Sequence, residues 1–96
     1  MKNHQIKLIE STYPVRDARD VLFSLINDKI EFLNQKIFSL QERFGSDTGH
    51  LEKRVKELRA ELQLLLDLLK TMHEDQLIKI HCEIDMKISE PERVQN

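Results

Sequence analysis

The chain has 96 residues, of which 40% are hydrophobic and 33% charged, and its net charge is −2. A chain this short forms one domain at most, and its weak acidic balance provides no field that attracts nucleic acid or an anionic membrane. A single cysteine excludes an intramolecular disulfide framework and favours a cytoplasmic location, and the sequence has neither the apolar run of a signal peptide nor that of a membrane span.

The N-terminal segment is short and β-prone. Over residues 5–11, Ile6 and Leu8 fall on one side and Lys7 on the other, which is the alternation of a half-buried strand. Pro14 then ends the strand, because proline suits the first turn of a helix and restricts its predecessor to extended geometry. We therefore expect a strand over 5–11, followed by a helix from residue 15.

Two long amphipathic helices are expected in the middle of the chain. In each, apolar residues recur at alternating spacings of three and four, the period of helices packed side by side. The two stripes are Phe23, Ile26, Ile30, Leu33, Ile37, Leu40 and Phe44, then Leu51, Val55, Leu58, Leu62, Leu65, Leu69 and Met72. Gly45 suits the left-handed conformation just after a helix. Because the loop over 45–49 is short, the helices over 15–44 and 50–75 should form a long antiparallel, coiled-coil-like hairpin.

The C-terminal segment has the clearest period-two pattern in the chain. All even-numbered residues from 78 to 88 are apolar and the odd-numbered residues between them are polar. This alternation, rich in isoleucine, predicts a half-buried strand over 77–89 whose even-numbered residues face the helices. Pro91 follows it, and residues 90–96 are expected to form a tail.

The two strands should pair, which defines an α+β, predominantly helical fold of order β-α-α-β. Antiparallel pairing would place Ile6 and Leu8 beside the isoleucines of the second strand, on the same covered face. Ile80 and Ile84 should then be buried. The polar residues that should be exposed are Lys79, Glu83 and Lys87.

The helices carry more apolar side chains than one helix–helix seam can bury. Leaving a leucine-sized side chain exposed forfeits about 1.5–3 kcal/mol, and an exposed apolar patch usually marks an interface. A two-stranded sheet is also marginal alone and has open edges. We therefore expect a homodimer with a helical-bundle core and a small shared sheet. The candidate interface residues are Leu22, Leu25, Leu64, Leu66, Leu68, Ile80 and Ile84.

The polar and reactive residues indicate no catalytic, cofactor or metal site. The four histidines are scattered, and His81 and Cys82 would point to opposite faces of a strand, so they cannot both ligate one ion. Cys82 has no basic neighbour on its own face to favour the thiolate. Arg16 and Arg19 could bind an anion at the end of the seam, or be solvated beside nearby aspartates. The loop over 45–49 lacks the arrangement of a phosphate-binding loop.

These features favour a non-enzymatic interaction or scaffold protein that works as a homo-oligomer. An unidentified protein partner is compatible with them, whereas we expect no binding to nucleic acid or to a membrane. A strand followed by two helices is also similar to the ribbon-helix-helix DNA-binding proteins, but here the helices are about twice too long. Of the polar residues, only Lys7 and the ends of the strand are available to read bases. A small helical-bundle enzyme of the chorismate-mutase kind is the third alternative, but the seams lack the arginines and lysines that such a site needs.

Overall fold

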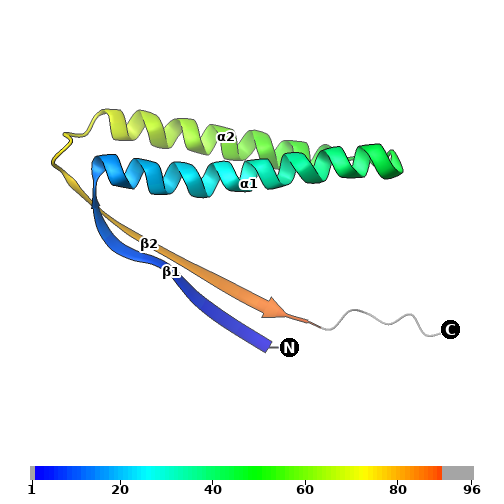
Figure 1. The fold of residues 1–96 in the computed structure, drawn as a ribbon, viewed down its shortest axis with the longest axis horizontal. Coiled ribbons are helices and arrows are strands. Elements are labelled where there is room, and N and C mark those ends of the chain that lie inside the picture. Colours follow the sequence, from blue (N-terminus) through cyan, green and yellow to red (C-terminus); the bar gives the residue numbers. More distant parts are fainter. Residues whose placement is uncertain (1, 90–96) are drawn as a thin grey trace.

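The computed structural model describes residues 2–89, and they form two strands and two helices (Figure 1). The elements are β1 (Lys2–Pro14), α1 (Val15–Phe44), α2 (Gly49–Lys70) and β2 (Leu77–Ile88). The two strands form one antiparallel sheet. The predicted α+β fold and its β-α-α-β order are therefore confirmed. The tail expected over 90–96 lies outside the described residues.

The helical seam follows the predicted stripes at its centre. Ile30 and Leu33 of α1 and Val55 of α2 are buried together. The partly buried residues packed against them are Ile26, Ile37, Leu51 and Leu58. The stripe of α1 fails at its ends, where Phe23 is 42% exposed and Phe44 is 71% exposed. Phe44 is the last residue of α1, and α2 offers no apolar side chain before Leu51 to cover it.

The link between the helices is a short capped turn. Gly45 has a φ of 58°, as predicted for the residue after α1, and its N–H donates to the Gln41 carbonyl at 3.1 Å. The hydroxyl of Thr48, which is buried, accepts a hydrogen bond from the Gln41 side chain at 2.9 Å. The Asp47 carboxylate accepts the Gly49 N–H at 2.9 Å. The first and third bonds satisfy backbone groups that helix ends leave unpaired, and the second joins the side chains of the two helix ends, so the reversal of direction is fixed locally.

The turn between α2 and β2 covers residues 71–76, and we call it the elbow. It begins earlier than expected. α2 ends at Lys70 instead of residue 75. Within the turn, the Gln76 N–H donates to the His73 carbonyl at 3.1 Å, and the Gln76 side chain accepts the His73 N–H at 2.8 Å. The Gln76 carbonyl in turn accepts the Val15 N–H at 3.2 Å. This bond ties the start of β2 to the start of α1.

The sheet pairs along the full length of both strands, with one irregularity. Lys2 lies opposite Ile88 and Pro14 lies opposite Leu77, so β1 extends beyond the expected range of 5–11 at both ends. A bulge at Leu8 shifts the register, because Ile6 lies opposite Ile84 but Ile9 opposite Cys82. Ile6 therefore lies beside an isoleucine of β2 as expected, but the face that the two residues share is not covered, since Ile6 is 39% exposed. Leu8, however, is the extra residue of the bulge and has no partner in the ladder.

The sheet lies against the helices only near the elbow. α1 contacts both strands, whereas among residues 2–89 α2 contacts no strand and packs on α1 alone. From the elbow the two strands diverge from the helical hairpin, so that the molecule has an open V shape (Figure 1). We call this shape the jaw, and its two arms are the helical hairpin (α1 and α2) and the sheet (β1 and β2). Its radius of gyration is 17.9 Å, against about 13 Å for a compact chain of 100 residues. Much of the sheet is therefore left without a covering layer.

Burial along β2 falls with distance from the elbow. Ile80 is 7% exposed, Ile84 and Met86 are each 38% exposed, and Ile88 is 51% exposed. The predicted direction of the alternation is confirmed, because Ile80 is buried and the polar residues Lys79, Glu83 and Lys87 are exposed. The predicted burial of Ile84 is wrong for the single chain. The reason is that α1 and the sheet separate before they reach this residue.

Candidate interaction surface

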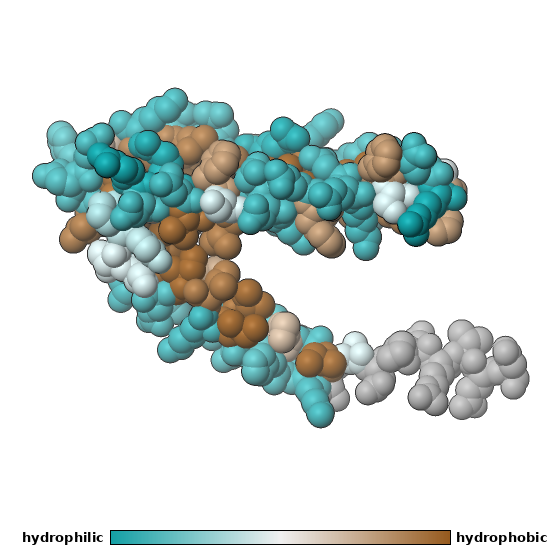
Figure 2. Space-filling view, in the orientation of Figure 1, coloured by the Kyte–Doolittle hydropathy of each residue, from teal (hydrophilic) through white to brown (hydrophobic). Residues whose placement is uncertain are grey.

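An uncovered apolar surface lies on the half of the sheet farther from the elbow. We call it the sheet patch. Its residues, each 38–51% exposed, are Ile6, Leu8, Ile84, Met86 and Ile88. Figure 2 shows apolar residues gathered along the strands on the side that faces the helices, with open space between the two arms of the jaw. Ile84, Met86 and Ile88 share one face because they alternate along β2, and Ile6 lies directly opposite Ile84. Leu8 has no partner in the ladder, but it lines a cleft against α1 and so lies on the same side of the sheet.

A cleft lies between β1 and α1, close to the elbow. Leu8 and Ile9 line it from the strand, and Val21 and Leu25 line it from the helix. Phe32 follows Leu25 by seven residues and therefore lies on the same side of α1, two turns farther from the elbow. Phe32 is 55% exposed. The helical arm of the jaw therefore presents apolar side chains toward the same opening as the sheet patch.

The predicted interface residues do not form one surface. Leu25 and Ile84 belong to the two arms of the jaw, whereas Leu64 and Leu68 are 69% and 54% exposed and lie one turn apart on α2. Leu66 lines a groove between the two helices. Leu22 is partly buried, and Ile80 is buried within the chain itself.

Four residues of the sheet patch were missed by the sequence analysis as interface candidates, namely Ile6, Leu8, Met86 and Ile88. Their signal was present, since they belong to the strand alternation. The alternation places them on the face that the helices were expected to cover along the whole strand, so they were assigned to the chain's own core. The angle between the two arms is what exposes them.

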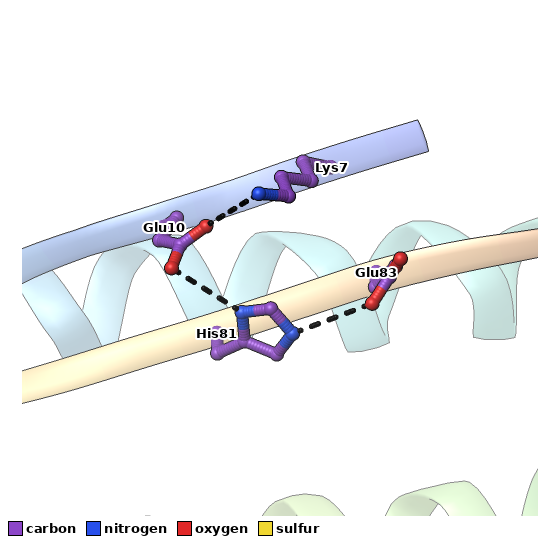
Figure 3. A network of polar contacts seen from close by, with 4 residues as sticks. All are labelled: Lys7, Glu10, His81 and Glu83. Atoms are coloured by element: carbon purple, nitrogen blue, oxygen red, sulfur yellow. Dashed lines mark ion pairs between the residues drawn. The ribbon is translucent and has the colours of Figure 1, made fainter. Parts of the chain in front are cut away.

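The opposite face of the sheet is polar and solvated. Glu10 of β1 lies 3.6 Å from the Lys7 ammonium and 4.0 Å from Nδ1 of His81, and Nε2 of His81 lies 3.6 Å from Glu83 (Figure 3). The side chains of His81 and Glu10 are about half exposed, at 52% and 47%. Exposed pairs of this kind contribute from nothing to about 1 kcal/mol. This face therefore stabilises the sheet weakly and exposes no comparable apolar area.

The other polar candidates are dispersed. Arg16 lies 3.7 Å from the Glu74 carboxylate in the elbow, with both side chains well exposed, and Arg19 is exposed. Cys82 is a free, partly buried thiol. Across residues 2–89, no three His, Cys, Asp or Glu side chains gather where they could hold a metal ion.

Neither helix of the described range is long and apolar enough to cross a membrane. No protein-family model, no curated protein and no solved structure matches the chain.

Proposed function

We propose that the chain is a non-enzymatic protein-interaction module that works as a homodimer. The observation that supports this is the amount of surface left uncovered. The accessible surface is 8171 Å², whereas a compact monomer of this mass exposes about 5,800 Å². The eight residues outside 2–89 account for at most about 1,400 Å² of the difference, even if fully exposed. At least about 1,000 Å² per chain then remains in excess.

The excess has the size of a protein–protein interface. A standard interface buries about 800 Å² on each partner. Covering the half-exposed side chains of the sheet patch contributes about 3–6 kcal/mol per copy, before the cost of association is subtracted. A second copy meets this need directly, because a twofold-symmetric contact covers the same uncovered patch on both chains at once. In this dimer the helical hairpins would pack together on one side of a shared sheet.

Light scattering at micromolar concentration tests the proposal. We expect a mass of about twice 11.4 kDa. Ile84→Asp introduces a charge into the sheet patch and should give a folded monomer, because Ile84 is already 38% exposed within the chain. Phe38→Asp is the matched control, since Phe38 is 66% exposed on α1 and lies outside the patch. A wild-type chain that stays folded and monomeric at all concentrations would contradict the proposal.

A further inference from the structure

We propose that the two copies pair through the open edges of their β2 strands, antiparallel about a twofold axis at Cys82. The two sheets then become one four-stranded sheet of order β1-β2-β2-β1. This inference rests on the proposed homodimer and specifies its interface. It starts from the topology, because in a sheet of order β1-β2 each strand has one unpaired edge whose N–H and C=O groups can accept another strand.

The edge of β2 is better suited to pairing than the edge of β1. β1 is interrupted by the bulge at Leu8 and ends at Pro14. A bulge leaves a residue unpaired and twists the strand, and proline has no N–H to donate, so both features blunt an edge. β2 runs over Leu77–Ile88 with no such interruption. Its midpoint lies next to Cys82, so an axis there pairs nearly the whole strand.

The charges on the polar face select the register. An axis perpendicular to the sheet keeps the helices of both copies on one side, so opposite residues are both even-numbered or both odd-numbered. With the axis at Cys82, Lys79 lies opposite Asp85 of the second copy and His81 opposite its Glu83. Within its own sheet, Lys79 faces Thr12 and Asp85 faces Gln5. Pairing of two copies therefore supplies the opposite charges that their own β1 does not provide.

The two neighbouring registers, with the axis at Glu83 or at His81, give less favourable cross-strand pairs. An axis at Glu83 places Lys79 opposite Lys87 and Glu83 opposite itself, and like charges directly opposite one another are destabilising. An axis at His81 pairs Lys79 with Glu83, but it leaves Asp85 opposite the apolar Leu77 and shortens the paired range from 77–87 to 77–85. The register at Cys82 has one mismatch, Lys87 opposite the apolar Leu77, but it places no like charges opposite one another and pairs nearly the whole strand.

The same register also matches the apolar face. Ile84 falls opposite Ile80 of the second copy, and Met86 falls opposite its Ile78. Ile80 lies under α1 and is 7% exposed, whereas Ile84 and Met86 are 38% exposed. The uncovered half of each sheet is thus placed beside the helix-covered half of the other. The divergence of the strands from the helices, seen in Figure 1, then leaves room for the helices of the second copy.

Native Cys82 provides the first test. Opposite Cα atoms in an antiparallel pair are about 4.5–5.5 Å apart, within the range of about 4.4–6.8 Å that a disulfide spans. Mild oxidation of the native protein should give a covalent dimer on a non-reducing gel. In a Cys82→Ser background, Lys79→Cys and Asp85→Cys should each fail to cross-link alone and should cross-link when mixed. Both positions are exposed, so folding is not at risk.

Charge reversal provides the second test. Lys79→Asp, or Asp85→Lys, converts two attractive pairs per dimer into repulsive ones and should raise the dimer Kd about tenfold. The combined variant K79D/D85K restores opposite charges and should return the Kd to near the native value, whereas Lys36→Asp on α1 should leave it unchanged. A protein that is dimeric by light scattering, does not cross-link through Cys82 and ignores both single reversals would overturn the β2 pairing alone. A folded monomer would overturn the homodimer as well.

Discussion

The substitution Ile80→Asp is the most direct test of the packing of β2 on α1. Ile80 is 7% exposed, on the face of β2 that packs against α1. Its replacement forfeits about 1.5–3 kcal/mol of apolar burial. The new carboxylate would be buried without a partner, which costs several kcal/mol more. Since a chain of this size is stable by about 5–14 kcal/mol in total, Ile80→Asp should remove most of the free energy of unfolding.

Aspartate at position 81 is the matched control, one residue away on the opposite face. The His81 side chain is 52% exposed, and its contacts to Glu10 and Glu83 are 4.0 Å and 3.6 Å long. Losing two exposed contacts of this kind, and adding a third carboxylate beside them, should cost the folding of each chain at most about 1 kcal/mol. In the proposed dimer the new carboxylate also faces Glu83 of the second copy, which should weaken association about as much as the charge reversal at position 79.

Urea denaturation followed by circular dichroism, at one fixed protein concentration, measures both variants. We expect a cooperative transition close to the native one for His81→Asp and little or no cooperative transition for Ile80→Asp. If the two variants lose equal stability, the faces of β2 are misassigned. If both retain native stability, the packing of β2 on α1 does not hold the fold together.

Three further outcomes are expected. Urea denaturation should show that Leu33→Ala lowers the free energy of unfolding by about 2–5 kcal/mol, because Leu33 is 5% exposed in the seam. The same measurement should show a change within about 0.5 kcal/mol for Glu52→Ala, on the exposed side of α2. Gly45→Ala should cost about 1–2 kcal/mol from backbone conformation alone, because an added Cβ at this residue meets nothing within 4 Å; a neutral result would contradict the left-handed cap. Binding to duplex DNA should be negligible by fluorescence anisotropy at physiological salt, because the polar face of the sheet mixes lysines with carboxylates; sub-micromolar affinity with a steep salt dependence would contradict this.

The helical part of the fold was predictable because its signals are local. α1 runs over Val15–Phe44, between the proline and the glycine that the sequence offers as its limits. The buried seam around Ile30, Leu33 and Val55 follows from spacings of three and four along each helix. The alternation of β2 likewise fixed which of its faces is apolar.

The remaining features depend on contacts between distant segments. Residues 71–73 are compatible with helix, so nothing in them predicts the end of α2 at Lys70; the elbow must instead bring β2 back to Val15. The alternation in β1 is compatible with an unbroken ladder, so the bulge at Leu8 was not foreseen. The angle between the sheet and the helices was not predicted for a similar reason. Long two-stranded ribbons twist strongly, and the total twist, which sets the direction of the strands relative to the helices, cannot be read from the residue pattern.

The bulge in β1 has a consequence for how the chain length can vary. Ile6 and Ile9 are three residues apart, but their partners Ile84 and Cys82 are two apart. Removing Leu8 would therefore leave every other cross-strand pair intact and every side chain on its present face, whereas removing a residue elsewhere in the strand would turn one end of it over. Position 8 is thus the point in β1 where a one-residue deletion can be accepted without redesigning the sheet.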